Sequence, residues 1–162
     1  MDINKALDIL IELQTILPKT FACFGTALGC IREGNIIEHD LDVDMGLLYE
    51  DFKLEELFYT VQIHDYYIKG ANKYRIPIWK DGIKTDIHIY YKFDDLRYDY
   101  LGRNGSICLS HPSSSIEKIK EIEINGYKIR TLGEKYLNVV YGEDWEVVKK
   151  DFNWKTDHKN RI

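Results

Sequence analysis

The chain has 162 residues, with 44% hydrophobic and 30% charged side chains and a net charge of -5, as in ordinary soluble globular proteins. Because its lysines and arginines are scattered, and duplex binding relies on basic patches that neutralise phosphates, we expect no nucleic acid duplex as a partner. No apolar run approaches the ~20 residues that span a bilayer, so we expect a cytoplasmic protein without a membrane segment.

The first third of the chain predicts helices that alternate with strands. Apolar residues recur every three or four positions between Asp2, a helix cap, and Pro18, which ends the pattern. Short apolar or alternating runs predict buried strands. The expected elements are a helix over 3–17, a strand over 20–24, a helix over 26–33, a strand over 41–48 and a helix over 51–59.

The remainder of the chain predicts hairpins and a late helix. Asp-Gly at 81–82 and Asn-Gly at 125–126 are strong signals for two-residue hairpin turns. The polar segment 92–115 predicts a loop with one short strand near Ile107. The expected elements are strands over 61–68, 73–79, 83–91, 119–124 and 127–130, a helix over 133–141, and another short helix before a polar tail.

No repeat or low-complexity linker interrupts the chain, so we expect one α+β domain over 1–162. Twelve tyrosines favour strands and an aromatic-lined cleft over a helical bundle. Cys23, Cys30 and Cys108 form neither a zinc nor a disulfide pattern, which indicates buried, reduced thiols.

A run of alternating carboxylates marks the strand expected over 41–48. Asp40, Asp42 and Asp44 would point one way, while Leu41 and the other apolar residues between them would point into the core. Two carboxylates about 4 Å apart repel by roughly 4 kcal/mol at an effective dielectric near 20, so such a site recruits a cation or raises one pKa. Hard oxygen ligands favour Mg²⁺ or Mn²⁺.

A third carboxylate comes from the strand expected over 83–91. Asp86, His88 and Tyr90 share one face of that strand. If the strand lies beside the first, Asp86 becomes a third metal ligand or a base, an arrangement that suits metal-assisted phosphoryl transfer. His88 is then either a neighbour of the metal ligands or part of an ordinary polar face.

Other interpretations of the acidic run remain open. A solvated strand edge would carry the same charges. A calcium loop would use Asp40, Asp42, Asp44 and Asp51, but Met45 stands where that loop needs glycine. A glycosyltransferase-type Asp-x-Asp would follow a nucleotide-binding βαβ unit, for which the chain has no room.

A glycine turn precedes the acidic run. Gly25 lets the backbone approach a ligand closely, and Thr26 can cap the helix or bond a phosphate oxygen. No Gly-Lys-Ser/Thr follows, so the turn is not a P-loop. Arg32, just beyond the helix, and Arg75, on the strand over 73–79, can reach the same phosphate. A tight strand-to-helix turn without a ligand is the alternative.

Together these residues resemble the LicD family, which includes phosphocholine transferases and fukutin-type ribitol-phosphate transferases. Its Gly-Thr-x-Leu-Gly-x-x-Arg segment stands at 25–32, and its Ile-x-x-Asp-x-Asp-Val-Asp segment at 37–44. Asp86 matches a third feature, and a late Tyr-Leu-x-x-x-Tyr-Gly-x-x-Trp stands at 136–145. His39 replaces a frequent Trp. The resemblance implies a nucleotidyltransferase (DNA polymerase beta-like) fold, with a mixed β-sheet flanked by helices.

The resemblance also implies an activity, in which a phospho-alcohol passes from a cytidine diphosphate-linked donor to a glycan hydroxyl. Asp42 and Asp44 would hold Mg²⁺ or Mn²⁺, and Asp86 would complete the metal site or accept the acceptor's proton. Nucleotidyl transfer from a nucleoside triphosphate, or nucleotide binding without catalysis, are the alternatives that the same motifs allow. Substrate contacts are expected from Gly25, Thr26, Arg32, Asp40 and Arg75.

Overall fold

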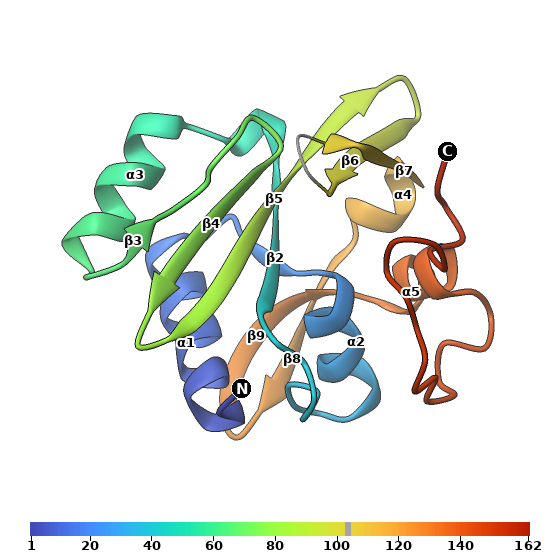
Figure 1. The fold of residues 1–162 in the computed structure, drawn as a ribbon, viewed down its shortest axis with the longest axis horizontal. Coiled ribbons are helices and arrows are strands. Elements are labelled where there is room, and N and C mark those ends of the chain that lie inside the picture. Colours follow the sequence, from blue (N-terminus) through green and yellow to red (C-terminus); the bar gives the residue numbers. More distant parts are fainter. Residues whose placement is uncertain (103–104) are drawn as a thin grey trace.

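A computed structural model describes residues 1–102 and 105–162, and nine strands in this part of the chain form one mixed sheet (Figure 1). The strand order is β3-β4-β5-β2-β1-β9-β8, with β6 paired to the far end of β5 and β7 paired to β6. The strands are β1 (Phe21–Ala22), β2 (Val43–Leu48), β3 (Tyr67–Ile68), β4 (Arg75–Lys80), β5 (Ile83–Phe93), β6 (Leu96–Leu101), β7 (Ile107–Pro112), β8 (Ile119–Ile124) and β9 (Tyr127–Leu132).

Helices cover both faces of the sheet, which confirms the α+β fold with a mixed sheet. Helices α1 and α3 contribute to one apolar cluster, and α2 and α5 to a second. In Figure 1, α3 and β3 lie at one end of the molecule and α5 with the C-terminal segment at the other. The helices are α1 (Ile3–Ile16), α2 (Phe24–Arg32), the 3-10 turn η1 (Tyr49–Asp51), α3 (Leu54–Ile63), α4 (Ser113–Ile116) and α5 (Glu134–Tyr141).

The first helix forms where the sequence predicts it. Asp2 caps α1, because its Oδ1 accepts a hydrogen bond of 3.2 Å from the backbone N–H of Lys5. The residues at helical spacing, among them Leu10 and Leu13, are buried against the sheet. This packing places α1 beneath the strands that carry the site and leaves their opposite face to α2 and α5.

The central pair of strands, β2 and β5, is parallel, as the expected site requires. Asp44 lies opposite Asp86 in the register, and Gly46 opposite His88. Because side chains alternate along a strand, Met45 and Ile87 enter the core beside α1, while the polar residues face the other way. Leu41, expected in the core, is 82% exposed, since β2 begins only at Val43.

Several predicted boundaries are wrong. The segment 92–115, expected as a loop with one short strand near Ile107, contains both strands β6 and β7 and most of the short helix α4. The strand expected near Ile107 is β7. Helix α3 extends to Ile63, so the strand expected over 61–68 is reduced to β3. Helix α2 begins at Phe24, two residues before the expected start. In residues 142–162 the structure has turns and one isolated bridge in place of the expected second helix.

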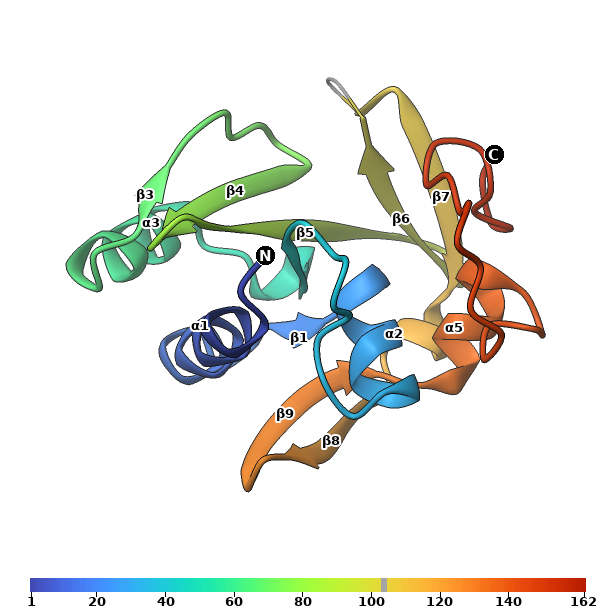
Figure 2. The same ribbon diagram turned by 60° about the horizontal axis from the view of Figure 1, so that its bottom comes forward.

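The C-terminal segment is held by the β6–β7 hairpin. Leu109 on β7 forms a bridge with Arg161, and the N–H of Ser110 donates to the carbonyl of Asn160. Figure 2 shows this segment running beside β7. As a result, residues far apart in sequence enclose one side of the sheet.

Two smaller expectations can be compared with the structure. Cys23, Cys30 and Cys108 are free thiols, and the first two are buried, as expected, whereas Cys108 is only partly buried. Among the described residues, no helix combines the length and hydropathy needed to cross a bilayer. The cytoplasmic location stays a prediction.

Candidate active site

A cavity of about 400 Å³ lies beside the first residues of the central strands β2 and β5. The residues that line it include four carboxylates, five lysine or arginine side chains and the turn at the start of α2. All sequence-predicted site residues line it except Thr26. The lining residues from that predicted set are Gly25, Arg32, Asp40, Asp42, Asp44, Arg75 and Asp86.

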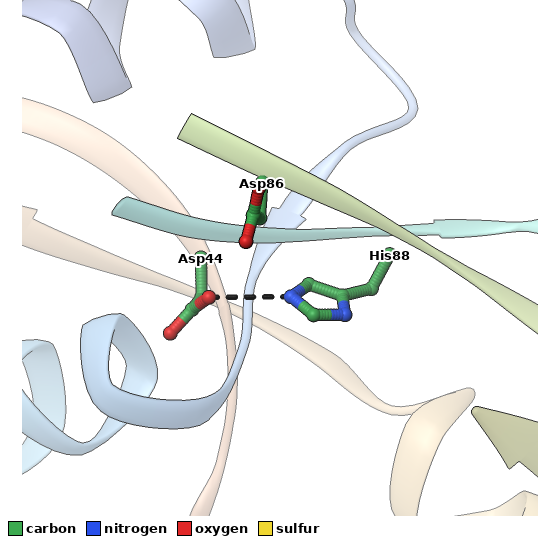
Figure 3. Close-up of side chains that lie close together, drawn as sticks. All are labelled: Asp44, Asp86 and His88. Carbon is green, nitrogen blue, oxygen red and sulfur yellow. Dashed lines mark hydrogen bonds and ion pairs between the residues drawn. The ribbon is translucent and has the colours of Figure 1, made fainter. Parts of the chain in front are cut away.

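The centre of the site is a trio from β2 and β5. Asp44, Asp86 and His88 each offer one ligand atom, and these atoms lie within 4.8 Å of one another. Figure 3 shows the three side chains converging, with His88 Nε2 3.2 Å from Asp44 Oδ1. Burial raises the pKa of Asp44, and the hydrogen bond from His88 opposes that rise. His88 thus already lies beside this pair of carboxylates, of which Asp86 is buried and Asp44 partly buried.

On the side of its ring away from Asp44, His88 contacts a second acidic residue, which is buried. Its Nδ1 lies 3.6 Å from Oδ1 of Asp99, a fully buried residue of β6. Burial alone would lower the pKa of His88, but Asp99 and Asp44 outweigh it and raise that pKa to about 10. The imidazole is thus a charged group between two carboxylates, and Phe24 packs edge-on against it at 5.0 Å.

The remaining acids are held by basic side chains. Lys84 Nζ lies 2.8 Å from Oδ2 of Asp42 and 2.7 Å from Oδ2 of Asp86. Arg75 Nη1 reaches the same Asp86 oxygen at 3.0 Å. Burial alone would lower the pKa of Lys84, but its hydrogen bonds to Asp42 and Asp86 raise it. Asp86 Oδ1 is buried and has no hydrogen-bond partner among the described residues.

Asp40 sits against the glycine turn. A Cβ added to Gly25 would lie 2.5 Å from Asp40 Oδ2, so a side chain at this position would displace the carboxylate from where it lies. Burial, followed by the charges of Asp44 and Asp42, raises the pKa of Asp40 to about 7. The start of α2 and the acidic loop before β2 thus form one wall of the cavity.

Of the predicted substrate contacts, Thr26 does not line the cavity, and Arg32 lines it while contacting other groups of the protein. Thr26 is fully buried, and its hydroxyl accepts a 2.8 Å hydrogen bond from the backbone N–H of Asp44, so it positions β2 rather than facing the cavity. Arg32 is the last residue of α2 and lines the cavity. Its guanidinium contacts Glu33 at 2.7 Å and the carbonyl of Trp145 at 3.5 Å.

The C-terminal segment also lines the cavity, with apolar residues beside cations. Val147 and Trp154 line it although they are 62% and 44% exposed, beside the cations Lys149 and Lys150. Such exposed apolar groups beside a charged site are typical of ligand-binding clefts. The lining is therefore amphipathic, because it combines carboxylates with aromatic and aliphatic groups.

Sequence reasoning missed three residues that shape this site. Lys84 shares the face of Asp86 because it stands two positions earlier on one strand, and that spacing was a usable signal. Asp99 lies in the segment expected as a loop, where no periodicity marks it. Trp154 lies in the C-terminal turns, and only the three-dimensional fold brings it to the cavity.

The residues present fit a hard divalent ion. Several carboxylate oxygens converge, and one of them, Asp86 Oδ1, is buried without a partner among the described residues. Oxygen-rich sets of this kind bind Mg²⁺ or Mn²⁺. His88 and Lys84 already neutralise part of the charge.

This arrangement, with carboxylates on paired strands beside a glycine turn, defines a nucleotidyltransferase fold. The lincomycin-bound crystal structure of the lincosamide antibiotic adenylyltransferase LnuA matches with a TM-score of 0.55 at 14% identity, covering 80% of this chain and 79% of that chain. The solution structure of the antibiotic-resistance factor ANT(2'')-Ia matches with a TM-score of 0.54 at 17% identity, covering 95% and 80%. At these identities the likeness shows the fold alone.

The chain belongs to the LicD family. Residues 19–131 match the family model described as LicD/FKTN/FKRP, nucleotidyltransferase domain. Ribitol-5-phosphate transferase FKTN from Homo sapiens and from Macaca fascicularis are each 23% identical over 155 residues, 84% of this chain. The chain spans 31% of the length of these curated relatives. It is thus a domain of a transferase family.

Proposed function

We propose that the chain is a metal-dependent transferase that moves a phospho-alcohol, such as ribitol phosphate or phosphocholine, from a CDP-linked donor to a glycan hydroxyl. The observation that carries the proposal is the register of β2 and β5, which sets Asp44 opposite Asp86 at one end of the cavity. The name of the FKTN relatives, ribitol-5-phosphate transferase, supports the class of group transferred.

Asp42, Asp44 and Asp86 are the residues that would hold Mg²⁺ or Mn²⁺. When bound, the ion neutralises phosphate charge that develops as the phosphoryl group is transferred. Gly25, at the start of α2, brings backbone N–H groups and the positive end of the helix to the cavity. Arg32 and Arg75 add cationic donors for the same phosphates.

In the proposed reaction, an acceptor hydroxyl oxygen attacks the phosphorus that carries the alcohol. The bond from that phosphorus to the bridging oxygen breaks, and cytidine monophosphate leaves with both bonding electrons. The acceptor's proton passes to a carboxylate. Asp86 Oδ1 is the oxygen proposed to accept it, because this atom has no hydrogen-bond partner among the described residues. The glycan acceptor would approach from the open side of the cavity.

The apolar residues of the lining fit the nucleoside end of the donor. The cavity lining combines carboxylates with the apolar residues Trp154 and Val147, which suits a molecule with charged phosphates at one end and a planar base at the other. These apolar residues follow α5 in the sequence and line the same cavity as the carboxylates of β2 and β5. We therefore propose that residues 1–162 work as one domain.

Nucleotidyl transfer from a nucleoside triphosphate is the second candidate. The solved structures of similar fold include the adenylyltransferase LnuA, and the same carboxylates serve that reaction. The two candidates differ in what the acceptor receives, namely a phospho-alcohol or a nucleotide.

A donor screen followed by product analysis tests the proposal. A ligand that binds only the folded protein raises its melting temperature, so CDP-linked and UDP-linked alcohols are compared with Mn²⁺ by thermal shift. The best donor, labelled in its alcohol, is then incubated with glycan acceptors. The proposal predicts labelled glycan and free cytidine monophosphate. Label that stays with the nucleotide, or an acceptor that gains the nucleotide, contradicts it.

A further inference from the structure

The acidic site contains a cation of its own. The ammonium group of Lys84 lies 2.8 Å from Oδ2 of Asp42 and 2.7 Å from Oδ2 of Asp86, so it bridges two of the three proposed metal ligands. Asp86 is 3% exposed and Lys84 25% exposed, so the contact is only partly open to solvent. Charges in such a position are screened less than those of a surface ion pair.

The bridge and a metal ion compete for the same two carboxylate groups. A divalent ion held by Asp42 and Asp86 would lie about 2.0–2.2 Å from each carboxylate oxygen. The ammonium group occupies the space between those carboxylates, and two cations that share a pair of ligands repel strongly at this distance. The ammonium group of Lys84 must therefore move away from Asp42 and Asp86 when the ion binds both.

Lys84 has room to move. It lines the cavity, and its flexible four-carbon stem carries a charge that can be re-aimed without moving β5. Arg75 bonds Asp86 Oδ2 at 3.0 Å and makes no such bridge to Asp42 among the described contacts. Lys84 is thus the basic side chain that joins the two acids.

We propose that Lys84 is a resident counter-ion of the acidic site, which a divalent ion displaces from Asp42 and Asp86 when it binds. This inference rests on the proposed metal function of the site. The lysine holds the carboxylates together before the ion arrives, and it makes the ion bind more weakly than the acids alone would. Once displaced, its ammonium group stays in the cavity, where the phosphates of a donor can bind it.

Calorimetric titration of the full chain with MnCl₂ alone tests this inference. Lys84→Met and Lys84→Gln both remove the charge, and glutamine retains the ability to hydrogen-bond. If one of these variants fails to fold, the other is sufficient for the test. We expect at least about tenfold tighter Mn²⁺ binding in either variant, because a competing charge near the ion is gone. Lys84→Arg keeps the charge and should bind as the wild type does.

Lys80→Met is the matched control. Lys80, on β4, pairs with Glu12 of α1 at 2.7 Å and does not line the cavity. It should leave Mn²⁺ affinity unchanged. Mn²⁺ should also raise the melting temperature of Lys84→Met more than that of the wild type. Equal or weaker Mn²⁺ binding in folded neutral variants would overturn the inference alone. Absence of Mn²⁺ binding in every protein, the wild type included, would overturn the proposed metal function and the inference with it.

Discussion

Asp44 and Asp86 lie directly opposite each other on the parallel strands β2 and β5. Their register is fixed by the apolar residues on the other face of the same strands, because a slip of one residue would turn those residues out of the core. The position of the proposed metal ligands thus follows from core packing.

Asp44→Asn or Asp42→Asn should abolish transfer and leave the fold intact. Loss of a metal ligand removes several kcal/mol of transition-state stabilisation, which corresponds to about a thousandfold or more in rate. Burial raises the pKa of Asp44, so a neutral amide there carries no added burial cost. Product formation at saturating Mn²⁺ and donor checks the rate, and melting checks the fold. Asp8→Asn, on the exposed side of α1, is the control. Near-normal turnover in a folded Asp44→Asn or Asp42→Asn protein would refute the assignment.

Gly25→Ala should weaken Mn²⁺ and donor binding with little loss of stability. The new Cβ would meet Asp40 Oδ2 at 2.5 Å, and this flexible carboxylate can move away while the helix gains a better helix former. We expect the free energy of unfolding to change by no more than about 1 kcal/mol. The clash vanishes in the background Asp40→Ala, so the two substitutions together should cost less than their sum. Full additivity would show that Gly25 acts in another way.

Thr26→Val should lower the free energy of unfolding by about 1–3 kcal/mol, because the backbone N–H of Asp44 would lose its buried acceptor. Valine has nearly the shape of threonine, so packing changes little. Thr26→Ser keeps the hydroxyl and should lose less. Urea denaturation measures all three proteins, and a valine variant as stable as the serine variant would exclude the positioning role.

His111 should contribute to acid sensitivity. It is fully buried, and burial lowers its pKa to about 4, whereas the unfolded chain protonates histidine near pH 6.5. Between these values the unfolded state binds a proton that the folded state does not, so the free energy of unfolding falls as the pH falls from about 6.5 to 4. The contribution is at most about 3 kcal/mol, at about 1.4 kcal/mol per pH unit. His111→Gln should flatten the unfolding free energy against pH in this range, and an unchanged slope would contradict the assignment.

The two central strands could be predicted from sequence because their signal is local. Alternation along β5 places Asp86 and His88 on one face and Ile87 on the other, as the structure confirms. The parallel pairing of β5 with β2 was only a condition of the sequence argument. It depends on contacts between distant segments, which no local pattern records.

The hairpin of β6 and β7 could not be predicted in the same way. Strand β6 carries buried charged residues, which is unusual for a strand in a protein core. Arg97 pairs with Glu50 at 2.8 Å, and Asp99 pairs with His88. A hydropathy pattern shows such residues as exposed loop, because their partners come from other elements. The same limit concealed the bridge from Lys84 and the contribution of the C-terminal turns to the cavity.

The proposed transferase site depends on one divalent ion bound by carboxylates of β2, β5 and the loop between α2 and β2. Anomalous diffraction from crystals grown with Mn²⁺ locates the ion directly. We expect one manganese peak at about 2.0–2.3 Å from oxygens of Asp42, Asp44 and Asp86, with Lys84 turned away from it. Manganese bound elsewhere, or an acidic cavity that holds none at saturating Mn²⁺, would contradict the account.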